Sequence, residues 1–228
     1  IVPGGGLTRA GIDKEGNDLA HLLSQAGIAG LVLKFRNAKT SKTFNGIEVM
    51  EADIRRAIRL TRFHASDWNI NPQRVGTFGF SAGGIVAVTP LIHPVGERPD
   101  HQDRIDRLSS EVAFFGGAYP LLSMQTEVAG AGYQKLLFGE KPTKDQINKY
   151  SAELHITPNM APAFVAHAMD DKGVIAENSL RFESAYKKAG ARIRTFFRDT
   201  GGHGYGIRNM GAPINQWVNS YMIWIQEQ

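Results

Sequence analysis

The feature that most constrains this sequence is a serine between two glycines, at a predicted junction of strand and helix. Residues 79–83 are Gly-Phe-Ser-Ala-Gly, a G-x-S-x-G motif. The apolar run at 75–80 predicts a buried strand, and the small and apolar residues at 82–88 predict a helix packed closely on a sheet. So sharp a turn leaves no room for bulky neighbours, and its glycines expose the serine hydroxyl. We therefore predict that Ser81 is a nucleophile.

Strands alternate with helices along the chain. We predict strands at 30–35, 75–80, 112–119, 163–167 and 191–198, and helices at 19–26, 49–67, 82–88, 177–188 and 214–225. This order predicts an α/β fold with a mainly parallel sheet and helices on both faces. The 228 residues fit one domain, 1–228, with loops and short helices around 93–160. Because ligands bind beyond the carboxyl ends of such strands, functional residues should follow strands directly.

A serine nucleophile needs a histidine that takes its proton and a carboxylate that orients the histidine. After a serine at such a turn, the acid comes first along the chain and the histidine second. His203 stands in a glycine-flanked loop directly after the last predicted strand. His21 and His64 precede the serine, and His167 ends a strand, where a satisfied core histidine is more common. The order and the loop therefore predict His203 as the base.

The acid is expected in the loop after the strand at 163–167, where Asp170 and Asp171 are adjacent. The spacing to the valine that follows favours Asp171 as the partner of the histidine. Asp170 is then expected to cap the turn or to bind backbone N–H groups. A buried aspartate at this place would fix the imidazole tautomer and favour its charged form.

A glycine run at 3–6, Pro-Gly-Gly-Gly, follows the short strand-like start of the chain. Backbone N–H groups of such a loop can point at a developing oxyanion without interference from side chains. We predict that Gly5 and Gly6 form this oxyanion hole together with the N–H of Ala82. A dinucleotide loop is the weaker alternative, because no G-x-G-x-x-G pattern with a following acidic residue is present. Four residues near strand ends are candidates both for the substrate pocket and for the core: Phe80, Tyr119, Pro120 and Tyr205.

Composition excludes several other classes of function. The net charge is +4 without a run of five basic residues, so we expect no nucleic-acid or membrane tract. The absence of cysteine excludes disulfides, thiolate catalysis and cysteine-based zinc sites. Arg55, Arg59 and Arg62 share one side of the helix predicted at 49–67, and we interpret them as a solvated face rather than a phosphate site. No metal or organic cofactor is expected.

These motifs together resemble the microbial carbohydrate-esterase branch of the α/β hydrolases, which includes acetylxylan and feruloyl esterase-like proteins. The resemblance rests on these matches: Pro3-Gly4-Gly5-Gly6, Asp13-Lys14-Glu15-Gly16, Val32-Leu33-Lys34-Phe35-Arg36, Arg56-Ala57-Ile58-Arg59-Leu60, Gly79-Phe80-Ser81-Ala82-Gly83-Gly84, Ala168-Met169-Asp170-Asp171, Glu177-Asn178-Ser179 and Gly201-Gly202-His203-Gly204. It implies the α/β-hydrolase fold, Ser81, Asp171 and His203 as a triad, and the glycine loop as the oxyanion site. It also suggests a secreted or periplasmic protein.

The sequence departs from that branch at several places, among them the N-terminal strands, the position of Leu7, and the run after Asp171, which lacks the proline that is common there. Members usually carry two further strands before the glycine loop, and this sequence lacks those N-terminal strands. Leu7 stands where an aromatic residue is frequent, so the preference for an acyl group is open.

The function that follows from the resemblance is hydrolysis of small acyl esters, above all acetyl esters, of plant polysaccharides or oligosaccharides such as xylan. The expected partner is thus a small-molecule or oligosaccharide ester. Two alternatives stay open at this point. One is a serine peptidase or arylformamidase, which would use the same triad on a different substrate. The other is a non-catalytic binding module on the same scaffold.

Overall fold

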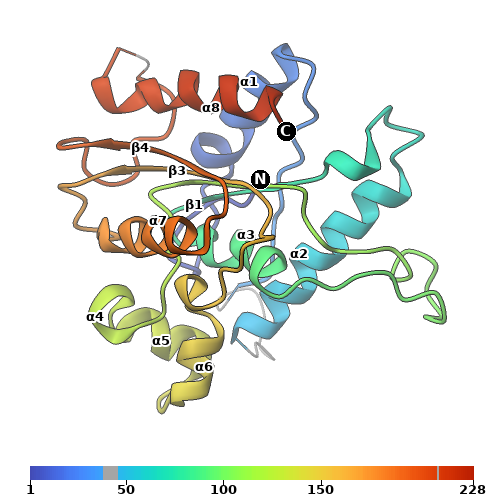
Figure 1. Cartoon of the computed structure of the whole chain (residues 1–228), viewed down its shortest axis with the longest axis horizontal. Coiled ribbons are helices and arrows are strands. Elements are labelled where there is room, and N and C mark those ends of the chain that lie inside the picture. Colours follow the sequence, from blue (N-terminus) through green and yellow to red (C-terminus); the bar gives the residue numbers. More distant parts are fainter. Residues whose placement is uncertain (38–45, 210) are drawn as a thin grey trace.

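Four parallel strands form the centre of the computed structural model, which describes residues 1–37, 46–209 and 211–228 (Figure 1). They are β1 (Thr77–Phe80), β2 (Phe115–Ala118), β3 (Ala163–Ala168) and β4 (Ile193–Arg198). The strands lie in chain order across the sheet, and each pair of neighbours is parallel. The predicted α/β fold with a mainly parallel sheet is therefore confirmed.

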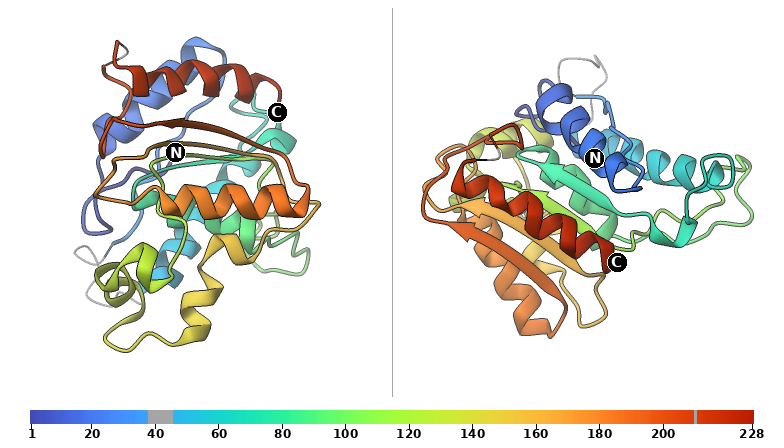
Figure 2. Two further views of the ribbon diagram at one scale, coloured as in Figure 1. Left: turned by 60° about the vertical axis from the view of Figure 1, so that its left-hand side comes forward. Right: turned by 90° about the horizontal axis from the view of Figure 1, so that it is seen from above.

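Helices cover both faces of the sheet (Figures 1 and 2). One face carries α1 (Asp18–Gln25) and α8 (Trp217–Gln226), and the other carries α2 (Gly46–Phe63), α3 (Gly83–Ile92) and α7 (Glu177–Ala189). The short elements are η1 (Asp13–Asn17), η2 (Pro72–Arg74), α4 (Thr126–Ala129), α5 (Ala131–Phe138), α6 (Lys144–Lys149), η3 (Ala152–Leu154) and η4 (Pro213–Gln216). Among the described residues, no helix combines the length and the apolar character that crossing a membrane requires.

Alternation along the strands divides the core into two apolar clusters. Phe80 and Phe164 belong to the cluster under α1 and α8, whereas Phe115 and Val165 belong to the cluster under α2, α3 and α7. Successive side chains of a strand point to opposite faces, so β2 and β3 each contribute to both clusters. All ten residues of α3 are buried, which is why this helix is small and apolar on every side.

The strand predicted at 30–35 is not formed. Its backbone makes two hydrogen bonds with Ile1: the amino group of Ile1 donates to Leu31 O at 2.8 Å, and Leu33 N donates to Ile1 O at 2.9 Å. Val2, the next residue, bridges to Gly79 of β1. Within the described residues, Ile1 is too short a partner to continue a ladder of hydrogen bonds along 30–35. The segment therefore stays irregular, although its own composition favours a strand.

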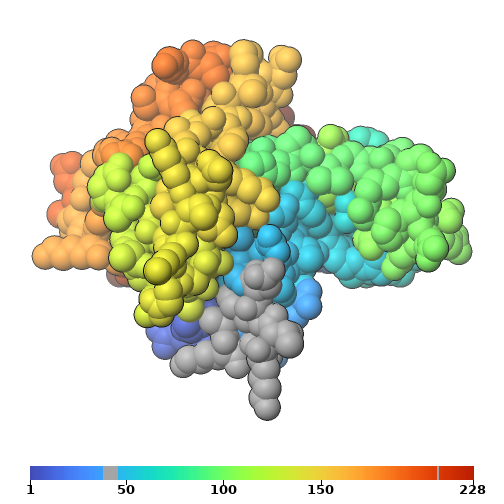
Figure 3. Space-filling model, turned by 90° about the horizontal axis from the view of Figure 1, so that it is seen from below, coloured from blue at the N-terminus to red at the C-terminus, as the bar shows by residue number. Residues whose placement is uncertain are grey.

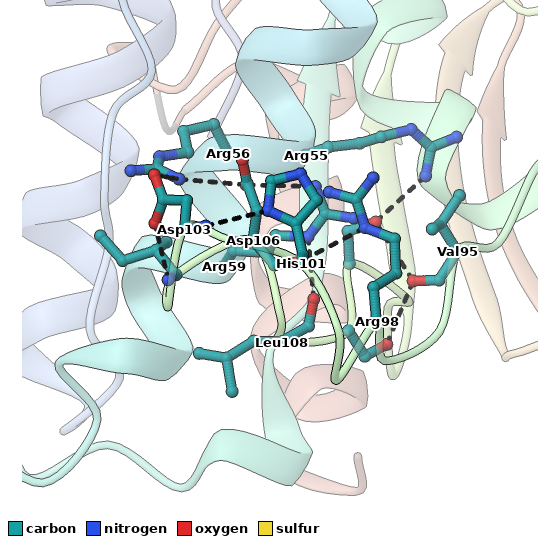
Figure 4. Close-up of polar contacts among 12 residues, drawn as sticks. Arg55, Arg56, Arg59, Val95, Arg98, His101, Asp103, Asp106 and Leu108 are labelled. Atoms are coloured by element: carbon teal, nitrogen blue, oxygen red, sulfur yellow. Dashed lines mark hydrogen bonds and ion pairs between the residues drawn. The ribbon is translucent and has the colours of Figure 1, made fainter.

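The interpretation of Arg55, Arg59 and Arg62 as a solvated face was wrong. Arg55 and Arg59 are only 8% and 5% exposed. The guanidinium groups of all three arginines donate to backbone carbonyls of the segment 93–111. Arg55 donates to His93, Arg59 to Leu108, and Arg62 to Ser109 and Glu111. Figure 4 shows Arg59 reaching Leu108 beside the pair Arg56–Asp103. Carbonyls outside regular structure need donors, and the arginines supply them.

The region 93–160 contains two kinds of structure. Residues 93–114 form a loop without a helix or strand, and α4, α5, α6 and η3 follow the central strand β2. Figure 3 shows the loop, in green, projecting to one side of the molecule. The short helices, in yellow, gather beside α7, which is orange. Because β2 lies between them in the sequence, the loop and the short helices are two separate additions to the sheet.

Candidate active site

Ser81 lies at the sharp turn between β1 and α3. Its φ of +48° is in the left-handed region, which a non-glycine residue adopts only where the surrounding structure enforces it. A Cβ at Gly79 would lie 2.7 Å from Gly84 Cα, and one at Gly83 would lie 2.4 Å from Val2 O. Both flanking glycines are therefore required by close backbone contacts, as the motif predicts.

His203 joins Ser81 to Asp171. Its Nε2 lies 2.8 Å from Ser81 Oγ, and its Nδ1 lies 2.7 Å from Asp171 Oδ2. A carboxylate only accepts hydrogen bonds, so Nδ1 carries the proton and Nε2 is free to accept the serine proton. The three side chains follow the carboxyl ends of β1, β3 and β4. Because the strands are parallel, these ends all lie on the same side of the sheet. The structure thus brings all three predicted residues into one hydrogen-bonded chain.

Asp171, rather than Asp170, is the aspartate that contacts the imidazole. The Asp171 side chain is fully buried, and its Oδ1 accepts hydrogen bonds from Gly173 N at 2.7 Å and Val174 N at 3.0 Å. Burial alone would raise the pKa of Asp171, but hydrogen bonds from His167 and His203 outweigh it and hold that pKa well below its usual value. Asp171 is thus ionised at neutral pH.

Asp170 points to a different partner. Its Oδ1 accepts a hydrogen bond from Gly202 N at 2.8 Å, and the residue is exposed. Gly202 directly precedes the histidine, so Asp170 ties the acid loop to the histidine loop through the backbone. This agrees with the expectation that Asp170 binds a backbone N–H.

His167, which the sequence predicts to be a core residue, is a second imidazole beside Asp171. It is fully buried, and its Nε2 lies 2.8 Å from Val174 O and 3.2 Å from Asp171 Oδ2. Both are acceptors, so Nε2 carries the proton, and Ser179 Oγ donates to Nδ1 at 2.7 Å. The available signal was its place at the end of the strand, four residues before Asp171.

The glycine loop lies directly against the nucleophile. Val2 N donates to Phe78 O at 2.7 Å and Phe80 N to Val2 O at 3.0 Å, which fixes the start of the chain beside β1. A Cβ on Gly4 would lie 2.6 Å from Ser81 Cβ. Among the described residues, no hydrogen bond uses the N–H groups of Gly5, Gly6 or Ala82. These groups are the predicted oxyanion donors, and that role stays a prediction.

The four candidate pocket residues lie in different environments. Phe80 is fully buried, with its ring 4.9 Å from that of Phe78, and Pro120 is also buried. Tyr119 is fully buried, and its ring makes an edge-to-face contact with that of His203 at a centroid distance of 5.0 Å. Tyr205 is half-buried, and among the described residues its hydroxyl has no hydrogen-bond partner. Phe80 and Pro120 thus pack in the interior, Tyr119 packs on the histidine, and Tyr205 packs on Tyr119 at a centroid distance of 4.4 Å.

A cavity of about 550 Å³ lies away from these residues. Its lining includes Ile54, Thr77 and Tyr221, so it sits at the amino end of β1, whereas Ser81 follows the carboxyl end. The hydrogen-bonded chain, and not this cavity, therefore marks the candidate site. In the part of the chain that the structure describes, no three His, Cys, Asp or Glu side chains gather as a group that could hold a metal.

Comparisons with known proteins identify the family of this chain. Residues 1–186 match the BD-FAE family. The chain is 31% identical over 233 residues to an acetylxylan esterase of Xylanibacter ruminicola, across 99% of this chain and 44% of that protein. It is 26% identical over 212 residues to endo-1,4-beta-xylanase B of Butyrivibrio fibrisolvens, across 92% of this chain and 32% of that protein. The chain thus spans less than half the length of these curated relatives.

A solved structure matches nearly the whole chain. The acetyl ester-xyloside bifunctional hydrolase of Caldicellulosiruptor lactoaceticus superposes with a TM-score of 0.91 at 30% identity, covering 99% of this chain and 81% of that one. Esterase 2 of Thermogutta terrifontis superposes with a TM-score of 0.77 at 21% identity, which supports the fold alone. The family match and the superposition agree with the order of Ser81, Asp171 and His203 along the chain. The chain belongs to the BD-FAE family of α/β hydrolases, and its relatives include an acetylxylan esterase.

Proposed function

We propose that residues 1–228 are a single catalytic domain of a serine esterase that removes acetyl or similarly small acyl groups from carbohydrate esters such as xylan. The observation that carries the proposal is the chain of hydrogen bonds from Ser81 Oγ through His203 to Asp171, at 2.8 Å and 2.7 Å. Membership of a family of carboxylic ester hydrolases supports the reaction class. The names of the acetylxylan esterase and the acetyl ester-xyloside hydrolase support the acetyl and xylose chemistry.

In the proposed reaction, Ser81 Oγ attacks the ester carbonyl carbon while its proton passes to His203 Nε2. The carbonyl oxygen becomes an oxyanion that accepts hydrogen bonds from the N–H groups of Gly5, Gly6 and Ala82. His203 then gives the proton to the leaving alcohol oxygen, and an acyl-serine forms as the C–O bond breaks. A water molecule, deprotonated by His203, attacks the acyl-serine; its carbon–Oγ bond breaks, the carboxylic acid leaves, and His203 returns the proton to Ser81 Oγ. Asp171 stays ionised and stabilises the imidazolium.

The test is hydrolysis of an aryl acetate together with labelling by a fluorophosphonate. Ser81→Ala should lower turnover by at least about 1,000-fold and abolish labelling, since it removes the attacking oxygen. Ser66→Ala is the matched control, because Ser66 is an exposed serine after α2. A wild-type protein that neither turns over the ester nor takes the label would contradict the proposal and favour a non-catalytic binding module.

Substrate class is tested with acetylated xylan, a feruloyl ester, an aryl formamide and a peptide amide. The proposal expects release of acetate from acetylated xylan at the highest kcat/KM. Faster hydrolysis of the peptide amide or the formamide would replace the carbohydrate ester with a peptidase or arylformamidase function. It would leave the roles of Ser81, His203 and Asp171 unchanged.

A further inference from the structure

Glu15 is a buried carboxylate next to the candidate site that the proposed reaction does not use. It lies in η1 and is 8% exposed. Oε2 accepts a hydrogen bond from Gly4 N at 2.9 Å, and Oε1 accepts one from Tyr119 Oη at 2.9 Å. Among the described residues, no Lys, Arg or His forms an ion pair with it. A buried carboxylate is costly unless it is well hydrogen-bonded, so these two donors fix where it lies.

On one side, Glu15 holds the glycine loop. Gly4 lies between the carboxylate and the nucleophile: a Cβ on Gly4 would lie 2.6 Å from Ser81 Cβ and 2.7 Å from Glu15 Oε2. Gly4 O also accepts a hydrogen bond from Gly11 N at 2.9 Å, so both backbone polar groups of Gly4 are held. The direction in which the chain leaves Gly4 sets where the N–H groups of Gly5 and Gly6 point.

On the other side, Glu15 reaches the histidine loop through Tyr119. Tyr119 follows β2 with a φ of +42°, and its ring packs edge-to-face against that of His203. Its hydroxyl donates to Glu15 and accepts a hydrogen bond from Gly206 N at 3.1 Å. Burial, reinforced by the charge of Glu15, raises the pKa of Tyr119 well above 10, so the hydroxyl keeps the proton that it donates. Lys14, the neighbour of Glu15, donates to Gly204 O in the same loop.

We propose that Glu15 is a positioning residue that, through Gly4 and Tyr119, sets the oxyanion loop and the histidine loop relative to Ser81. The inference rests on the proposed esterase function and names a residue on which its transition state depends. Oxyanion donors act only within hydrogen-bond distance of the developing charge, so a small shift of the loop is costly. Glu15 touches no substrate atom in this scheme, so its effect should fall on kcat rather than on KM.

The main test is Glu15→Gln, assayed with an aryl acetate. The amide has the shape of the carboxylate but only one acceptor oxygen, so it cannot accept from both Gly4 N and Tyr119 Oη. We expect kcat to fall about 10- to 100-fold, because displaced oxyanion donors lose most of their effect. KM should change by less than about threefold, and the midpoint of the acidic limb of the pH–rate profile should stay in place, because Asp171 and His203 are untouched. Glu97→Gln, at an exposed glutamate, is the matched control.

Tyr119→Phe provides an independent variant that keeps the ring on His203 and removes only the hydroxyl. It should also lower kcat, and the double variant should lose less than the product of the two single losses, because both variants break the same hydrogen bond. A kcat within about threefold of wild type in a folded Glu15→Gln protein would overturn the inference. If Glu15→Gln does not fold, an unchanged kcat in Tyr119→Phe overturns it instead. An inactive wild type would overturn the esterase function itself, whereas an active wild type with indifferent variants would overturn only this inference.

Discussion

His167 Nε2 lies 3.2 Å from Asp171 Oδ2, the same oxygen that accepts the hydrogen bond from His203 Nδ1 at 2.7 Å. One carboxylate oxygen is therefore shared by two imidazoles, one fully buried and one at the surface of the site. The buried imidazole withdraws part of the charge that Asp171 presents to the other. This sharing leads to a prediction that distinguishes His167 from an ordinary core residue.

Replacing His167 with Gln should lower kcat by about tenfold, because the His167 contact helps to fix Asp171 against His203. It should also bring the pKa of Asp171 closer to its usual value, since the hydrogen bond from His167 lowers that pKa. The variant should also lose about 1–3 kcal/mol of stability, because buried polar groups are left without good partners. Ser179→Ala, which removes only the donor to His167 Nδ1, is the control. A destabilised variant whose kcat is unchanged would leave His167 with a packing role alone.

The two adjacent aspartates should differ greatly in their effect on catalysis. Asp171→Asn should lower kcat by about 10,000-fold, because an amide can hold the imidazole in the wrong tautomer. Asp170→Asn should lower kcat by less than about tenfold, because the one hydrogen bond that Asp170 accepts from the described residues comes from Gly202 N at the surface. Steady-state kinetics on both variants, with folding checked by circular dichroism, compares them. Equal losses would show that the contact between Asp171 and His203 is not the decisive one.

Acid stability should depend on Asp171. The pKa of this carboxyl is lower in the folded protein than in the unfolded chain, where it is about 3.9. Its contribution to the free energy of unfolding is therefore complete above about pH 4 and declines as the pH falls further, because the unfolded chain then binds more protons. Urea unfolding of wild type and Asp171→Asn between pH 2.5 and about 6 checks the sign. The stability advantage of the wild type should shrink below about pH 4, and an advantage that grows there would contradict the assignment.

Of two arginines in α2, the buried Arg59 should matter more for stability than the half-buried Arg56. Arg59→Met should cost about 2 kcal/mol, because Leu108 O loses a charged donor that lies 2.8 Å away. Arg56→Met should cost less than about 1 kcal/mol, since its ion pairs with Asp103 and Asp106 are partly exposed. Thermal unfolding compares the two variants, and limited proteolysis of the segment 93–111 shows whether the loop is released. A larger loss of stability in Arg56→Met than in Arg59→Met would mean that the ion pairs of Arg56, and not the contact of Arg59 with Leu108 O, hold the loop.

Much of the fold and of the candidate site could be predicted from the sequence. The alternation of apolar runs with helical periodicity indicated the parallel sheet, because each pattern depends on residues close in the chain. The G-x-S-x-G motif and the glycine-flanked histidine indicated Ser81 and His203 for the same reason: a sharp turn and a loop after a strand have local signatures. The strand at 30–35 was mispredicted, because composition describes the propensity of a segment and not whether a partner lies beside it.

Other features were decided only by the tertiary structure. The direction of the turn after β3 aims Asp171 at His203 and Asp170 at Gly202, although the two residues are adjacent and chemically identical. The burial of Arg55 and Arg59 arises from the loop that folds over α2, which helical periodicity cannot reveal. The contacts of Glu15 with Tyr119 and of His203 with Ser81 join residues more than a hundred positions apart. Local sequence patterns fix backbone conformation over a few residues, whereas such contacts exist only after the sheet has brought the strand ends together.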